Sequence, residues 1–127
     1  MRSPEQILRD AKTIAVVGAS PNPAKPSHGV ASYLERVGYR VLRVNPLCSD
    51  EGFWPSLASL EEPVDLVDVF RRPEFCADVA REAAAVGAPA LWLQLGIRSH
   101  EARIVAEASG IDYVENACTA VVHRNLG

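Results

Sequence analysis

Residues 13–30, which read TIAVVGASPNPAKPSHGV, constrain the fold of this chain more than any other stretch. The apolar run at 14–17 predicts a buried strand, Gly18 ends that strand, and a helical pattern begins near Ser27. Strand, glycine-led turn and helix in this order are typical of open α/β sheets, where the helix N-terminus beside the turn can bind phosphate groups. We therefore expect an α/β protein with a site at this turn.

Strands and helices continue to alternate along the rest of the chain. The apolar patterns and capping residues predict helices over residues 4–11, 27–37, 56–60, 73–86 and 99–109. They predict strands over residues 13–17, 39–44, 64–70, 90–95 and 111–114. This rhythm favours a Rossmann-like three-layer sandwich whose five-stranded parallel sheet has the order 3-2-1-4-5, with the reversal between the first and fourth strands. The tail from Asn116 onward is expected to be too short for a further unit.

The overall composition narrows the range of partners. With 127 residues, 48% of them hydrophobic, the chain is expected to form a single domain over residues 1–127. A net charge of −3 without a Lys/Arg block argues against a nucleic-acid partner, and no apolar run approaches the roughly 18 residues of a membrane span. Residues 1–10 lack the pattern of a signal peptide, so we expect a cytoplasmic protein. Cys48, Cys76 and Cys118 contain no CxxC pair, which fits reduced thiols and predicts no metal site.

The carboxyl ends of the predicted strands bring four loops to one edge of the sheet. These loops contain Gly18-Ala19-Ser20, Asn45-Pro46, Phe70-Arg71-Arg72 and Gln94-Leu95-Gly96. Gly18 alone would indicate only a strand-to-helix turn, but Lys25, Arg71 and Arg72 add cations suited to phosphate oxygens. The combination predicts an anion-binding site, and we expect Gly18→Val to block the ligand while leaving the fold intact.

The two common nucleotide fingerprints are missing from this sequence. ASPNPAKPS follows Gly18, so there is no G-x-G-x-x-G, and the second strand ends in Asn45-Pro46 where an acidic residue would hold the ribose of NAD. The sequence also has no G-x-x-x-x-G-K-[ST]. We therefore expect a pocket that suits a nucleotide but lacks the sequence motifs of NAD binding and of ATP hydrolysis.

Four linked motifs carry a family resemblance. They are VVGAS followed by KPS, RVNP, PVDLVDVFRRPE and LWLQLGI, and the resemblance that rests on them extends over residues 14–118. On these motifs the chain resembles the small stand-alone CoA-binding proteins, which are similar to the N-terminal domain of the succinyl-CoA synthetase alpha subunit. The resemblance implies a CoA-binding Rossmann-like domain with coenzyme A as its cofactor.

The resemblance also implies which positions of this chain surround the coenzyme. The implied diphosphate site consists of Gly18, Ala19, Ser20, Lys25, Pro26 and Ser27. The implied adenosine side consists of Asn45, Pro46, Val69, Phe70 and Arg71. Arg72 is a candidate because of its charge and not because of the resemblance. Gln94 and Gly96 would border the pantetheine path.

Three functions are compatible with this reading. The favoured one is a module that binds coenzyme A or an acyl-CoA and catalyses nothing on its own, because the chain has no recognisable set of nucleophile, base and orienting residue. The second is a small acyl-CoA-processing enzyme that uses Cys118 or His28. The third is a regulatory module that senses a nucleotide and acts through a partner protein.

Several side chains have simpler structural interpretations. Asp65 and Asp68 fall on opposite faces of one predicted strand, so they are not expected to form a catalytic pair. Trp92 is interpreted as a core residue. In the helix that Pro73 opens, an apolar stripe is expected to face the core, formed by Phe75, Val79, Ala83 and Val86.

Overall fold

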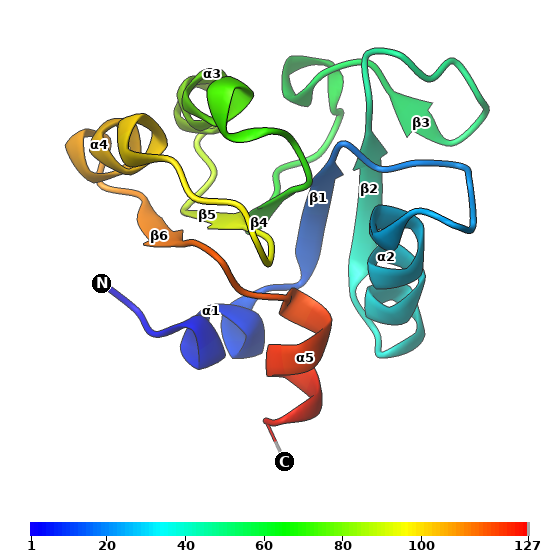
Figure 1. The fold of residues 1–127 in the computed structure, drawn as a ribbon, viewed down its shortest axis with the longest axis horizontal. Helices are drawn as coiled ribbons and strands as arrows, with labels where there is room; N and C mark the ends of the chain where they lie inside the picture. The colour runs from blue at the N-terminus through cyan, green and yellow to red at the C-terminus, as the bar shows by residue number, and fades with distance from the viewer. Residues whose placement is uncertain (127) are drawn as a thin grey trace.

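The computed structural model describes residues 1–126, which form one parallel sheet with helices on both faces (Figure 1). The strands are β1 (Thr13–Val17), β2 (Arg40–Val44), β3 (Phe53–Trp54), β4 (Leu66–Val69), β5 (Ala90–Leu93) and β6 (Asp112–Val114). The helices are α1 (Pro4–Asp10), α2 (Pro26–Arg36), the short 3-10 helix η1 (Leu57–Ser59), α3 (Pro73–Ala85), α4 (His100–Ala108) and α5 (Thr119–Arg124). No helix in this part of the chain is long and apolar enough to cross a bilayer.

The sheet has six strands in the order β3-β2-β1-β4-β5-β6, so the Rossmann-like α/β class is confirmed and the count of five strands is wrong. The order 3-2-1-4-5 is found in the structure, but its third strand is not the segment that was predicted as the third strand. The third strand is β3, and it has only two residues, which is too short to give an alternating pattern. The segment predicted as third is β4, and it pairs directly with β1 from Ile14↔Leu66 to Val17↔Val69. The order reverses between β1 and β4.

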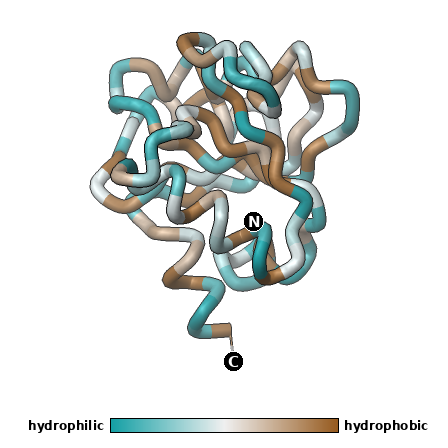
Figure 2. The backbone as a smooth tube through the Cα atoms, turned by 90° about the vertical axis from the view of Figure 1, so that its right-hand side faces the viewer, coloured by the Kyte–Doolittle hydropathy of each residue, from teal (hydrophilic) through white to brown (hydrophobic). Residues whose placement is uncertain are grey.

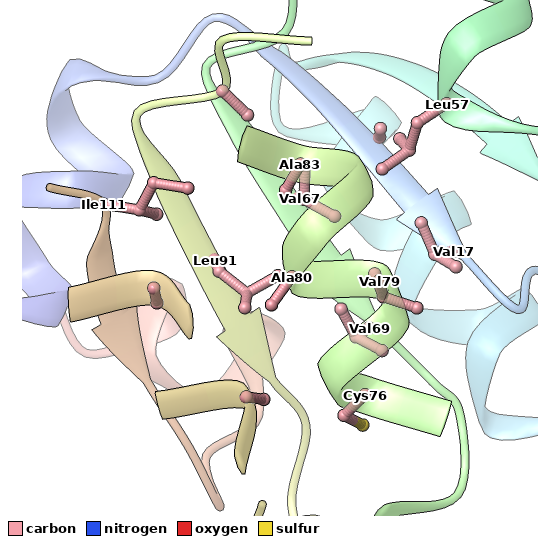
Figure 3. Close-up of a cluster of buried hydrophobic side chains, with 14 of the residues drawn as sticks. Val17, Leu57, Val67, Val69, Cys76, Val79, Ala80, Ala83, Leu91 and Ile111 are labelled. Atoms are coloured by element: carbon pink, nitrogen blue, oxygen red, sulfur yellow. The ribbon is translucent and has the colours of Figure 1, made fainter. Parts of the chain in front are cut away.

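Two apolar layers hold the helices on the sheet. On one face, residues of alternating strand positions pack against α3, α4 and η1, as in the contact of Val67, Val69 and Leu91 with α3 (Figure 3). The opposite face, which includes Val16 and Trp92, packs against α1, α2 and α5. Figure 2 shows the apolar strands gathered inside the chain trace. Because the central strands are buried on both faces, they read as continuous apolar runs, as the sequence predicts.

Helix α3 differs from its predicted orientation. Its buried residues are Cys76, Val79, Ala80 and Ala83, whereas Phe75 and Val86 are exposed by 40% and 37%. The predicted stripe is therefore wrong at both ends. The buried face of α3 is centred on Val79 and the small residues at 76, 80 and 83, so Phe75 and Val86 lie at its margins.

The tail contains a helix that the sequence analysis did not expect. Helix α5 has six residues and lies beside α1 and α2 (Figure 1). Nδ1 of its His123 lies 2.7 Å from the hydroxyl of Tyr33 in α2, and the side chains of its Thr119 and Ala120 are buried. So short a helix is not stable by propensity alone, and packing against the domain stabilises it.

Candidate functional site

The candidate site lies where the strand order reverses, at the carboxyl ends of β1 and β4. At this point the backbone N–H of Gly18 donates to the carbonyl of Val44 at 2.8 Å. The N–H of Phe70 donates to the carbonyl of Val17, also at 2.8 Å. These bonds join the ends of three strands and leave a crevice beyond them, as expected at a topological switch point.

Gly18 is required by the backbone geometry of this turn. Its φ is +89°, a conformation that residues with a side chain rarely adopt. A Cβ at this position would overlap the carbonyl oxygen of Phe70 and would come within 3.0 Å of the carbonyl carbon. The expectation that Gly18→Val leaves the fold intact is therefore wrong, since the neighbouring backbone would have to move.

The loop between β1 and α2 is held by local hydrogen bonds. The side-chain amide of Asn45 donates to the carbonyl of Ala19 at 2.8 Å, and the hydroxyl of Ser20 accepts from the N–H of Asn22 at 3.1 Å. Lys25 occupies the N-cap position of α2 and makes no side-chain capping bond. The positive end of the helix therefore has no capping side chain and remains open to an anion.

Three cations surround the crevice: Lys25, Arg71 and Arg72. None of the ion pairs among residues 1–126 includes any of them. The guanidinium carbon of Arg71 lies 4.6 Å from the centre of the Phe75 ring, a cation–π contact that helps to position this charge. Unpaired cations gathered in one crevice of a chain with net charge −3 are typical of an anion-binding site.

The crevice is a cleft of about 820 Å³. Nine of the predicted site residues line it: Gly18, Ser20, Lys25, Pro26, Ser27, Asn45, Phe70, Arg71 and Arg72. The structure thus brings predicted residues from three separate loops of the chain to one surface.

Five predicted residues do not line the cleft. Ala19 and Val69 are buried beneath it, and Gln94 is buried in a hydrogen-bond network. Pro46 and Gly96 are exposed next to lining residues.

Three lining residues were missed: Leu47, Phe75 and Ile97. Leu47 and Ile97 directly follow the predicted residues Pro46 and Gly96, so including one more residue of each loop would have found them. Phe75 was assigned to the core because its spacing matches the apolar stripe of α3.

A buried polar network lies behind the cleft. Nε2 of Gln94 donates to Oδ1 of Asp68 at 2.5 Å and to Oγ1 of Thr119 at 2.8 Å. The hydroxyl of Thr119 donates to Oδ2 of Asp68 at 2.9 Å. Burial raises the pKa of Asp68 to about 7, while the hydrogen bonds from Gln94 and Thr119 act in the opposite direction. Asp68 thus anchors α5 and β5 to β4 and has no exposed surface for substrate.

The other candidate reactive groups are separate from one another. Nδ1 of His28 lies 3.2 Å from the carbonyl oxygen of Ser20, which can only accept, so this nitrogen carries a proton. Asp65 accepts the backbone N–H groups of Lys12 and Thr13, both at 2.9 Å, and lies at the amino end of β4. Cys118 is half-buried at the N-cap of α5. Among the described residues, no group of three His, Cys, Asp or Glu side chains is arranged to hold a metal ion.

Comparison with known proteins identifies similar sequences. A family model described as a CoA binding domain matches residues 12–124. The uncharacterized protein YneT of Bacillus subtilis (strain 168) is 35% identical over 122 residues, which are 94% of this chain and 90% of that protein.

Solved structures extend the similarity to the fold. Cell-free ID.343 from Thermus thermophilus is 40% identical with a TM-score of 0.92, covering 99% of this chain and 100% of that one. A hypothetical protein from Pyrococcus horikoshii OT3 is 32% identical with a TM-score of 0.92, and the match covers 98% of this chain and 92% of that one. A further match is the dinucleotide forming acetyl-coenzyme A synthetase 1 of Ca. Korarchaeum cryptofilum in complex with phosphate and ADP. Its TM-score is 0.73 at 20% identity, and the match covers 83% of this chain and 26% of that one. At that identity the likeness is one of fold.

Proposed function

This chain belongs to the CoA binding domain family, and on that premise we propose that it binds coenzyme A in the cleft at the carboxyl edge of the sheet. The observation that carries the proposal is the gathering of Lys25, Arg71 and Arg72 around one cleft, none of them in an ion pair with the described residues. Coenzyme A carries a diphosphate and a 3′-phosphate, so its charge matches this arrangement.

The donors in the cleft fit the diphosphate. The open N-terminus of α2, the hydroxyl groups of Ser20 and Ser27, and the ammonium group of Lys25 come from one loop and the helix that follows it. Backbone N–H groups at a helix N-terminus favour phosphate oxygens because they combine hydrogen bonding with the helix dipole. We assign this side of the cleft to the diphosphate.

The remaining walls fit the other parts of the coenzyme. Arg71 and Arg72 present guanidinium groups suited to the 3′-phosphate of the adenosine end. Phe70, Leu47, Phe75 and Ile97 supply apolar surface for the adenine and for the pantetheine chain. A cleft of about 820 Å³ has room for a ligand of nucleotide size.

The lining residues favour binding over catalysis. Among residues 1–126, those that line the cleft include no Asp, Glu, His or Cys, the side chains that most often transfer protons or attack a thioester. His28 and Cys118, the candidates for an enzymatic role, are not among the lining residues. We therefore propose a binding module and not an acyl-CoA-processing enzyme.

Calorimetric titration of an arginine variant tests this proposal. Arg71→Ala removes a lining guanidinium, and we expect it to weaken coenzyme A binding by about 1–3 kcal/mol, the usual cost of losing a charged hydrogen bond. Arg81→Ala is the matched control because it removes an arginine from the same region of the chain, where the side chain is 61% exposed and pairs with Asp78. Equal affinity of the Arg71 and Arg81 variants would show that the coenzyme binds elsewhere.

A further inference from the structure

The loop at residues 94–97 follows β5 and reaches the cleft through Ile97. Ile97 of this loop lines the cleft, and its backbone is held by Asn116. Oδ1 of Asn116 accepts the N–H of Gly96 at 2.8 Å, and the N–H of Asn116 donates to the carbonyl of Ile97 at 3.1 Å. One residue of the C-terminal segment thus bonds to two successive residues of the loop.

The neighbours of Asn116 fix the same segment to the sheet. The carbonyl of Ala117 accepts from Nε1 of Trp92 at 2.8 Å, and the N–H of Ala117 donates to the carbonyl of Leu93 at 3.4 Å. Thr119 joins the buried network with Asp68 and Gln94. Since the residues directly after Asn116 are bonded to β5 and to the buried network, they give that side chain a fixed support from which it can hold the loop.

The polarity of the cleft indicates which part of a ligand meets this loop. The cationic side chains of the cleft come from the α2 and α3 sides, whereas residues 94–97 read QLGI and carry no charge. On the proposed function, the phosphates of coenzyme A lie toward the cations. Its uncharged pantetheine chain, which presents amide and apolar groups, is then left for the wall that includes Ile97.

We propose that Asn116 is a positioning residue that holds the Gly96–Ile97 backbone in the conformation that binds the pantetheine part of coenzyme A. The inference rests on the proposed function and extends it to a residue outside the cleft. Asn116 is not among the residues that line the cleft, and in this role it acts through its two hydrogen bonds to the loop backbone.

Variants at position 116 can remove the side-chain acceptor without changing the backbone conformation. The φ of Asn116 is +55°, a left-handed conformation that Asn, Asp and Gly tolerate better than other residues. Asn116→Gly therefore keeps the backbone but removes the acceptor for the Gly96 N–H. Asn116→Asp keeps both the conformation and an acceptor oxygen at the same place. Asn125→Gly is the matched control, because Asn125 lies exposed at the end of α5 with φ −91°.

The test is calorimetric titration of the full chain and these three variants with coenzyme A and with adenosine 3′,5′-bisphosphate, which lacks pantetheine. We expect Asn116→Gly to weaken coenzyme A binding about fivefold or more, as for a lost hydrogen bond, and to leave bisphosphate binding unchanged. Asn116→Asp and Asn125→Gly should both bind coenzyme A as the wild type does. Urea unfolding of each variant confirms that the domain is folded.

Other outcomes overturn the inference. Unchanged coenzyme A affinity in Asn116→Gly would show that the loop does not need this support. An equal loss for both ligands, or a loss in Asn116→Asp as large as in Asn116→Gly, would show a general structural role. Failure of the wild type to bind coenzyme A would instead refute the proposed function on which the inference rests.

Discussion

Replacing Gly18 by alanine tests the geometry of the turn at the centre of the site. The structure predicts two separate costs. The first is conformational, since a φ of +89° costs a residue with a Cβ about 1–2 kcal/mol. The second is steric, since the new Cβ would overlap the carbonyl oxygen of Phe70 and could be accommodated only by moving β1 and β4 apart.

The steric cost can be sized from the hydrogen bonds at this point. Separation of the strand ends would weaken the 2.8 Å bond from the Phe70 N–H to the Val17 carbonyl, and a backbone hydrogen bond contributes about 1 kcal/mol net. Gly18→Ala is therefore expected to lower the free energy of unfolding by about 2–3 kcal/mol. Gly52→Ala is the matched control: Gly52 has φ +87°, but a Cβ there would have nothing within 4 Å.

Urea denaturation of the wild type and the two variants measures this difference. We expect Gly18→Ala to cost at least about 1 kcal/mol more than Gly52→Ala, because only Gly18 has the steric cost. If the two substitutions destabilise equally, within about 0.5 kcal/mol, then the contact with Phe70 is relieved without strain and the steric reasoning is refuted.

Two further predictions concern groups outside the cleft. Because the native pKa of Asp68 is raised to about 7, the folded state holds an extra proton between about pH 4 and 7, so stability falls as pH rises through that window and is constant above it. The unfolding free energy of the wild type relative to Asp68→Asn should therefore decrease by up to about 1.4 kcal/mol per pH unit in urea titrations from pH 4.5 to 7.5, and a constant difference would contradict the burial argument. Tyr33→Phe removes the hydroxyl that lies 2.7 Å from His123 but keeps the edge-to-face ring contact, so we expect a loss of about 1 kcal/mol in urea unfolding. Unchanged stability of Tyr33→Phe would show that this bond does not hold α5.

Elements with several turns or buried strand positions were predictable from the sequence. The helix caps at Ser3 and Ser99 both make their expected side-chain bonds, to the N–H groups of Gln6 and Ala102. The elements that were missed, β3 and α5, have two and six residues. Neither is long enough to show a period, and both depend on contacts with distant parts of the chain.

The site was predictable to the level of loops but not of individual side chains. All four predicted loops come to one edge of the sheet because the carboxyl ends of parallel strands coincide. Within a loop, sequence alone does not say which neighbour faces outward: Phe70 lines the cleft, whereas Val69 is buried. Phe75 illustrates the same limit, since an apolar residue at helical spacing can face either the core or a ligand.

Calorimetric titration of the wild-type protein with coenzyme A, with NAD and ATP as parallel ligands, tests the central claim most directly. The unpaired cations of the cleft, together with the missing NAD and ATP fingerprints, predict micromolar or tighter binding of coenzyme A and no comparable response to the other two. Binding of NAD or ATP without binding of coenzyme A would contradict the account, and so would the absence of binding to all three.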